Sequence, residues 1–99
     1  MRVIAKRTLR RFWETAQGKG AKAALEAWHA QAVEADWSKP SEVKEHYGDA
    51  SILKGGRVVF NIAGNRYRLA VSINYPYRVV YVRFVGTHEE YDEIDAETI

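Results

Sequence analysis

The sequence contains no cysteine and only two prolines. Without cysteine the chain has no disulfide framework, no thiolate nucleophile and no thiolate metal site, which excludes many secreted scaffolds, zinc modules and redox enzymes. Long hydrophobic runs are absent too, because the apolar run at residues 79–82 is far shorter than the ~20 residues that span a bilayer. The N-terminus lacks the apolar stretch of a signal peptide. We therefore expect a soluble, cytoplasmic protein.

The length of 99 residues leaves room for a single domain, which we expect to span residues 1–99. Hydrophobic residues make up 46% of the chain and aromatic residues 12%, so the chain can bury a core.

Helical periodicity dominates the first half of the chain. After a short strand expected at residues 2–6, Thr8 is predicted to cap a first helix that Gly18 and Gly20 end. Apolar residues at helical spacing mark its buried face: Leu9, Phe12, Trp13 and Ala16. A second helix is predicted over residues 21–35, which gives a helical hairpin.

A third, short helix is predicted to begin at Pro40 and to end near residues 47–48, since proline suits the first helical turn. Three strands are then expected at residues 57–62, 66–74 and 79–85. They form an antiparallel meander with Gly64 and Asn65 as a two-residue hairpin loop and a longer turn at residues 74–77.

Alternation along these strands assigns each side chain to one face of the sheet. The predicted core face is apolar: Val58, Phe60, Ile62, Tyr67, Leu69, Val71, Ile73, Val80, Val82 and Phe84. The opposite face is polar and basic: Arg57, Asn61, Arg68, Tyr81 and Arg83. We expect an α+β fold: an antiparallel sheet of three to four strands, N-terminal helices packed on one face, and a short C-terminal helix. That last helix would begin at a capping box formed by Thr87 and Glu90, with His88 and Tyr91 on one side.

Charge is sorted along the chain. Residues 2–11 hold five basic residues and residues 51–85 hold six, with no acidic residue in either stretch, whereas residues 89–97 hold six acidic residues and no basic one. An exposed sheet face with uncompensated positive charge is what a polyanion binder requires. Alternatively, the arginines only keep a solvated face soluble and the acidic tail folds back as their counterion.

The residue types on this face suit metal-independent RNA cleavage. Arginine forks bind phosphate oxygens and keep their charge, histidine transfers protons near neutral pH, and tyrosines such as Tyr81 or Tyr91 stack unpaired bases. The histidines, His29, His46 and His88, lack metal-ligand spacing, so no metal and no cofactor is predicted. The alternative for each residue is structural: a lone arginine is often solvated, and Tyr91 could be a core residue.

Three ordered stretches resemble the HigB-type toxins of bacterial type II toxin–antitoxin systems, within the RelE-like superfamily: residues 57–62 (RVVFNI), 64–69 (GNRYRL) and 83–92 (RFVGTHEEYD). The opening at residues 3–13 and the ending at residues 94–99 are similar to the same family. The resemblance implies a RelE-like fold and a toxin that cleaves mRNA in the ribosomal A site by attack of the ribose 2′-OH, without metal. Expected products are a 2′,3′-cyclic phosphate or 3′-phosphate and a 5′-hydroxyl.

The resemblance also implies partners and a site. The partners are a HigA-type antitoxin with a helix-turn-helix domain, the ribosome and its mRNA, and operator DNA only through the antitoxin complex. Positions that fit the superfamily's active sites are Arg68, Arg83, His88 and Tyr91, with Lys54, Arg57 and Asn61 as supporting RNA contacts and Tyr81 as a further RNA-binding residue. We expect Arg68 and Arg83 to hold the scissile phosphate, His88 to transfer a proton, and Tyr91 to orient the ribose or stack a base. No carboxylate lies on the basic face to serve as the general base.

Other functions remain open at this point. The chain could be a non-catalytic module that binds RNA or the ribosome and blocks translation. It could also be a DNA-binding accessory subunit, although only the first helix, around residues 6–11, is basic. Three arginines of this helix, Arg7, Arg10 and Arg11, could contact ribosomal RNA, an acidic stretch of the antitoxin, or only solvent.

Overall fold

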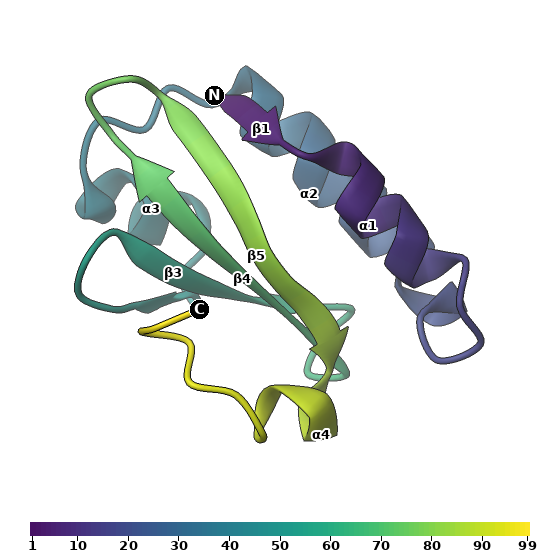
Figure 1. Ribbon diagram of the computed structural model, residues 1–99. Coiled ribbons are helices and arrows are strands. Elements are labelled where there is room, and N and C mark those ends of the chain that lie inside the picture. Colours follow the sequence, from purple (N-terminus) through teal and green to yellow (C-terminus); the bar gives the residue numbers. More distant parts are fainter.

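The computed structural model describes residues 1–99 and is an α+β structure built on one twisted sheet (Figure 1). The strands are β1 (Arg2–Ile4), β2 (Ser51–Ile52), β3 (Arg57–Ile62), β4 (Tyr67–Asn74) and β5 (Val79–Thr87). The helices are α1 (Lys6–Trp13), α2 (Lys22–Glu34), α3 (Pro40–His46) and α4 (His88–Tyr91), with a short 3-10 turn at Lys19–Ala21. None of the helices has the length and apolar character that a membrane-spanning segment requires.

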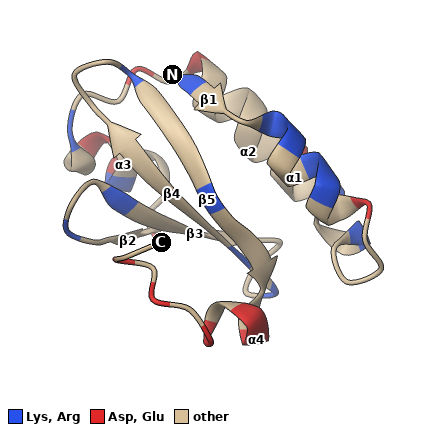
Figure 2. Cartoon of the chain, in the orientation of Figure 1, with Lys and Arg blue, Asp and Glu red and all other residues tan.

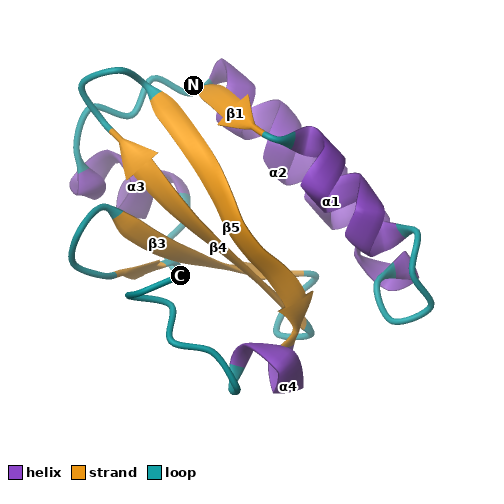
Figure 3. Cartoon of the chain, in the orientation of Figure 1, coloured by secondary structure: helices purple, strands orange, loops and turns teal.

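The sheet has five strands in the order β1-β5-β4-β3-β2 and is mixed (Figure 3). The predicted meander of β3, β4 and β5 is confirmed as antiparallel, but β1 pairs with β5 in parallel. The prediction of a purely antiparallel sheet with three to four strands was therefore wrong. The two-residue strand β2 had no recognisable periodicity, and the direction of β1 depends on the path of the helical segment between it and the rest of the sheet.

Helices α1, α2 and α3 cover one face of the sheet, and the core lies between these two layers. Leu9 and Trp13 of α1, Leu25 and Trp28 of α2, and Val43 of α3 are all buried in it. The predicted core residues of β3 and β4 are buried on the same side: Val58, Phe60, Ile62, Tyr67, Leu69, Val71 and Ile73. The assignment of side chains to faces on β3 and β4 is thus confirmed.

The start of α1 differs from the prediction. The helix begins at Lys6, and its N-cap is Ala5, which makes no side-chain cap, so Thr8 lies inside the first turn instead of before it. It ends at Trp13, before Gly18, because the Thr15 hydroxyl donates to the Phe12 carbonyl and accepts from the Gly18 N–H, which closes a turn. The hairpin between β3 and β4 also differs, since its loop runs over residues 63–66.

A β-bulge in β5 overturns one predicted face. Ala70 pairs with Phe84 while Val71 pairs with Val82, so Arg83 is an extra residue in β5 without a partner in β4. Each inserted residue reverses the alternation that follows it. Phe84, predicted in the core, therefore lies on the opposite face with Ala70, and Val85 takes the core side.

The face of the sheet opposite the helices is only partly open. Residues 92–99, which we call the C-terminal segment, fold back across its middle (Figure 1). Apolar contacts hold the C-terminal segment there, because Ala96 is buried together with Val59 and Ala70. The acidic side chains of the segment make no ion pair with an arginine of the sheet, since Asp92 contacts His88 and the other ion pair of the chain joins Arg78 to Asp36.

Candidate nucleic-acid interface

Three strands place a polar row across the open face of the sheet. Arg57 of β3 pairs with Ser72 of β4, and Ser72 pairs with Tyr81 of β5, so the three side chains are neighbours on one face. An Arg57 Nη1–H donates to Ser72 Oγ at 3.2 Å. Arg83 continues the row on β5, where its guanidinium carbon lies 5.3 Å from the centre of the Tyr81 ring. The row combines two fixed positive charges with an aromatic ring.

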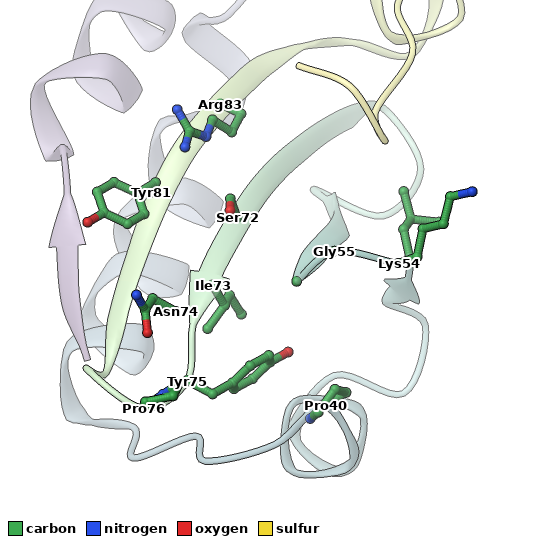
Figure 4. Close-up of a pocket in the computed structure, with 12 residues that line it drawn as sticks. Pro40, Lys54, Gly55, Ser72, Ile73, Asn74, Tyr75, Pro76, Tyr81 and Arg83 are labelled. Carbon is green, nitrogen blue, oxygen red and sulfur yellow. The ribbon is translucent and has the colours of Figure 1, made fainter.

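A shallow groove of about 650 Å3 adjoins this row (Figure 4). Its lining includes Lys54, Ser72, Asn74, Tyr75, Tyr81 and Arg83. Tyr81 and Arg83 stand on β5 at one side of the groove, and Lys54 lies at the other side with its ammonium directed outward. Of the residues predicted for RNA contact, Lys54, Tyr81 and Arg83 therefore share one groove, and Arg57 is bonded to its floor through Ser72.

Two glycines shape the loop that carries Lys54. Gly55 and Gly56 have φ values of +72° and +77°, in the left-handed region that favours glycine. The Gly56 carbonyl accepts from the Ile73 N–H at 2.8 Å, which ties the loop to β4. A Cβ atom at residue 56 would lie 2.7 Å from the Ile73 carbonyl oxygen, so only glycine allows this approach.

Two polar groups at this end of the sheet are buried without a hydrogen-bond partner: Arg57 Nε and the Tyr75 hydroxyl. Burial also raises the pKa of Tyr75 above its usual value. Buried polar groups are normally paired, so these two have hydrogen-bonding capacity that the chain itself does not use. Arg57 Nη2 is engaged, since it donates to the Ile99 carbonyl of the C-terminal segment at 2.5 Å.

Arg68 and Asn61 lie at the other end of the open face. They pair with each other across β3 and β4. The Arg68 guanidinium bends back toward the hairpin, where it donates to Asn65 Oδ1 at 2.6 Å. Arg68 pairs with Gly86, three residues beyond Arg83 on β5, and at ~3.3 Å per residue these positions are ~10 Å apart along the strand. The structure therefore does not bring Arg68 and Arg83 together around one phosphate, contrary to the expectation.

His88 lies in a second depression, of about 450 Å3, beside the first turn of α4. Its other lining residues include Asn65, Arg66 and Glu89. The predicted capping box that starts α4 is confirmed, because Thr87 Oγ1 accepts from the Glu90 N–H and Glu90 Oε1 accepts from the Thr87 N–H. His88 Nδ1 lies 3.6 Å from Asp92 Oδ2. The arginine that lines this depression is Arg66, which sequence reasoning did not select.

Tyr91 lies between these two regions and contributes to packing. Its ring centre is 6.2 Å from that of Phe84, and the side chain packs on the cluster of Val59, Ala70 and Ala96. Tyr91 also lines a depression together with Leu53, which follows β2, and Ile94, which belongs to the C-terminal segment. Tyr91 and the C-terminal segment thus separate the groove of Lys54, Tyr81 and Arg83 from the depression of His88.

Sequence reasoning missed Ser72, Tyr75 and Arg66 as candidates. Ser72 was assigned to the correct face, but a serine next to apolar residues carries no chemical signature of its own. Tyr75 lies in the turn between β4 and β5, where hydrophobic periodicity does not predict the direction of a side chain. Its part in the groove depends on the packing of that turn against the loop at residues 53–56.

An α+β fold that leaves a basic, groove-bearing sheet face exposed is typical of proteins that bind a polyanion. The comparison with protein families identifies the family to which this chain belongs. The family of HigB toxins, described as the RelE-like toxic component of a toxin–antitoxin system, matches residues 21–94. Because the match covers about three quarters of the 99 residues, the chain belongs to the HigB toxin family. It is the toxin of a toxin–antitoxin system, and its partner is an antitoxin. No curated protein sequence matches the chain.

Proposed function

We propose that this toxin is an endoribonuclease that cleaves mRNA in the ribosomal A site and thereby stops translation. In this proposal residues 1–99 act as one toxin domain in the cytoplasm. Its antitoxin is of the HigA type, with a helix-turn-helix domain through which the complex contacts operator DNA. The family supports toxicity in general, and the basic open face supports RNA as the target.

The observation that carries the proposal is the groove lined by Lys54, Tyr81 and Arg83 next to Arg57. Guanidinium groups bind phosphate oxygens through two parallel hydrogen bonds and do not lose their charge at any physiological pH. Arg57 carries a buried, unpaired Nε–H donor, so it has unused capacity to bind an oxyanion. The partly exposed Tyr81 ring offers a stacking surface for an unpaired base.

The proposed reaction consumes no reactant other than the RNA, because the 2′-OH loses one proton and the 5′-oxygen gains one. The ribose 2′-OH loses its proton, its oxygen forms a bond to the adjacent phosphorus, and the bond from phosphorus to the 5′-oxygen breaks. The 5′-oxygen accepts a proton and leaves as a 5′-hydroxyl, which leaves a 2′,3′-cyclic phosphate behind. Arg83 and Arg57 would stabilise the charge that develops on the phosphorus oxygens. His88 would exchange one of the two protons, as acceptor from the 2′-OH or donor to the 5′-oxygen, and solvent water would exchange the other.

RNA must reach both ends of the open face for these groups to cooperate. The route from Arg83 to His88 and Arg68 passes over Tyr91 and the C-terminal segment. We propose that the bound message displaces this segment, whose acidic side chains repel phosphate. Release of the Ile99 carbonyl then frees Arg57 Nη2 for the RNA. Arg68 turns from Asn65 to a different phosphate of the message, at its own end of the open face, and Asn61 contacts the RNA backbone beside it.

The test is primer extension on a message bound to ribosomes. We expect Arg83→Ala to slow cleavage by about 100-fold, by analogy with the ~10²–10³-fold loss on removing one oxyanion donor. His88→Ala is expected to slow it to a similar degree. The matched control is Lys22→Ala, which removes an exposed cation from the first turn of α2. Cleavage at the wild-type rate by both Arg83→Ala and His88→Ala would refute the proposed site.

A second function is favoured by one observation: Arg68 and His88 do not approach the groove of Arg83. The toxin would then block translation by occupying RNA, without cleaving it. The two functions leave the mRNA in different states. Cleavage produces mRNA with discrete ends inside codons, whereas a non-catalytic binder leaves the mRNA intact. Intact message on inhibited ribosomes would identify the non-catalytic binder.

A further inference from the structure

The groove beside Arg83 contains more than phosphate-binding groups, and several of its residues have no part in the proposed reaction. Its volume of about 650 Å3 lies within the ~300–1,000 Å3 of sites that hold small organic groups. Leu53, Ile73 and Pro76 give it an apolar part. Apolar walls favour the flat face of a nucleobase and not a hydrated phosphate. The groove therefore suits a base that lies next to the phosphate.

The ring of Tyr81 has different neighbours in the two directions along β5. Arg83 follows two residues later, and its guanidinium carbon lies 5.3 Å from the ring centre. In the other direction lies Asn74, which pairs with Val79, two residues before Tyr81. Figure 4 shows Arg83, Tyr81 and Asn74 in this order along the groove. Diagonal neighbours on one face are ~7–8 Å apart, so a base stacked on Tyr81 brings its edge within reach of Asn74.

The exposed side chain of Asn74 is oriented by a hydrogen bond within the turn between β4 and β5. Asn74 Oδ1 accepts from the Tyr77 N–H at 3.2 Å, so the oxygen is already engaged. The amide nitrogen, Nδ2, makes no hydrogen bond within the chain and lies on the side toward Tyr81 (Figure 4). An amide nitrogen donates and does not accept. Asn74 therefore presents a hydrogen-bond donor to a base on Tyr81.

The charged groups of the groove are donors as well. The Lys54 ammonium and the Arg83 guanidinium donate only, because neither has a lone pair that accepts a hydrogen bond. No aspartate or glutamate lines the groove, and none of the strands β3, β4 and β5 carries an acidic residue (Figure 2). The Ser72 hydroxyl already accepts from Arg57. A base edge that offers only acceptors therefore fits these groups best.

Guanine is the base whose edge meets this requirement most fully. It presents two adjacent acceptors, O6 and N7, whereas adenine has an amino donor in place of O6. Cytosine also presents an amino donor, and uracil presents the single acceptor O4. A donor that faces an amino group makes no hydrogen bond and leaves both groups desolvated, which disfavours adenine and cytosine.

We propose that the groove selects a guanine base of the message, which stacks on Tyr81 and accepts a hydrogen bond from Asn74 Nδ2. This inference rests on the proposed function, because it takes RNA as the ligand of the groove and adds the identity of the base beside the phosphate at Arg83. Asn74 is then a specificity-determining residue, and Arg83 binds RNA of any sequence.

The test measures the affinity of the full chain for oligocytidine heptamers that differ only in the central base, by fluorescence anisotropy. Their riboses are 2′-O-methylated, which removes the nucleophile, so binding is measured without cleavage. We expect central guanine to bind at least about fivefold more tightly than adenine, uracil or cytosine. Central inosine, which keeps O6 and N7, should bind like guanine.

The variant is Asn74→Asp, which keeps an oxygen for the Tyr77 N–H and replaces the donor by an acceptor. We expect it to abolish the guanine preference. Its added negative charge cancels in the ratio of affinities, because all heptamers carry the same phosphates. The matched control is Asn65→Asp, the same substitution in the loop between β3 and β4 and outside the groove, which should keep the preference.

Equal affinity of the wild type for the four bases would overturn the proposal. So would a guanine preference that survives Asn74→Asp, with the fold verified by its unfolding midpoint, or one that both Asp variants lose equally. The proposed function fails separately, by primer extension on ribosomes. Intact message together with a guanine preference that depends on Asn74 would refute the endoribonuclease and support selection of guanine by the groove.

Discussion

Two tyrosine hydroxyls occupy opposite situations in this protein. The Tyr47 hydroxyl is bonded to the side-chain oxygen of Gln31, whereas the Tyr75 hydroxyl is buried and has no partner. A made hydrogen bond contributes about 1 kcal/mol, and a buried unpaired group costs about 1–3 kcal/mol. The same chemical change at the two residues should therefore have opposite effects.

We expect Tyr75→Phe to raise the free energy of unfolding by about 1 kcal/mol, because it removes an unpaired oxygen and leaves the ring in place. Tyr47→Phe should lower it by about 1 kcal/mol. Urea denaturation of both variants measures these changes. A destabilised Tyr75→Phe would mean that the hydroxyl has a partner in solution.

Tyr47 also sets a pH limit on stability. Burial raises its pKa from 10.0 to about 12, so the protonated phenol is favoured in the folded state. The unfolded chain then binds fewer protons above pH 10, and stability falls as the pH rises from 10 to 12. Below pH 10 this contribution is fully present. Denaturation midpoints measured across that range should fall less steeply for Tyr47→Phe than for the wild type.

At the scale of elements, the sheet and the C-terminal segment decide which residues meet. The bulge at Arg83 places Arg83 and Phe84 on the open side, and Phe84 then forms the support for Tyr91. The C-terminal segment covers the middle of the face and engages Arg57. The folded-back acidic tail, considered from composition as a counterion, is held by apolar contacts and one backbone carbonyl.

Deleting residues 92–99 should show separately how the C-terminal segment stabilises the fold and how it affects RNA binding. We expect a loss of about 1–2 kcal/mol in stability, because Val59 and Ala70 lose their cover. Binding of a fluorescent single-stranded RNA should strengthen, because Arg57 is released and four acidic residues are removed. These residues are Asp92, Glu93, Asp95 and Glu97. The control replaces those four acids by Asn or Gln and keeps the apolar contacts. Weaker RNA binding by the deletion variant would show that the segment belongs to the RNA site.

At the scale of the whole molecule, aromatic contacts join the helical layer to the sheet. Phe60 of β3 packs edge-on to Trp28 of α2 at 5.4 Å and to Tyr47 at 5.0 Å. It also stacks on Trp37 at 6.2 Å. Phe60 thus contacts three segments that lie between β1 and β2 in the sequence, which favours a single cooperative unit.

We expect Phe60→Leu to lower the free energy of unfolding by about 1–2 kcal/mol, through lost volume and lost aromatic pairs. Because Phe60 bridges the layers, near-UV and far-UV circular dichroism should report the same lowered midpoint. Separate transitions for helix and aromatic signals would contradict one cooperative domain over residues 1–99.

The sequence by itself determined the features that local chemistry controls. Helix α3 starts at Pro40, the capping box starts α4, and alternation places Arg57 and Tyr81 on the face opposite the core. These features depend on residues within a few positions of each other along the chain. The resemblance of residues 57–62, 64–69 and 83–92 to the HigB toxins was equally local, and the family match confirms it.

Only the tertiary structure decided how distant segments meet. The parallel pairing of β1, the bulge at Arg83, and the position of residues 92–99 over the sheet each depend on contacts between segments remote in sequence. The separation of Arg68 and His88 from Arg83 follows from the same contacts. Alternation along a strand determines the face on which a side chain lies, but it does not determine the distance between two side chains on that face. Packing and strand register set those distances.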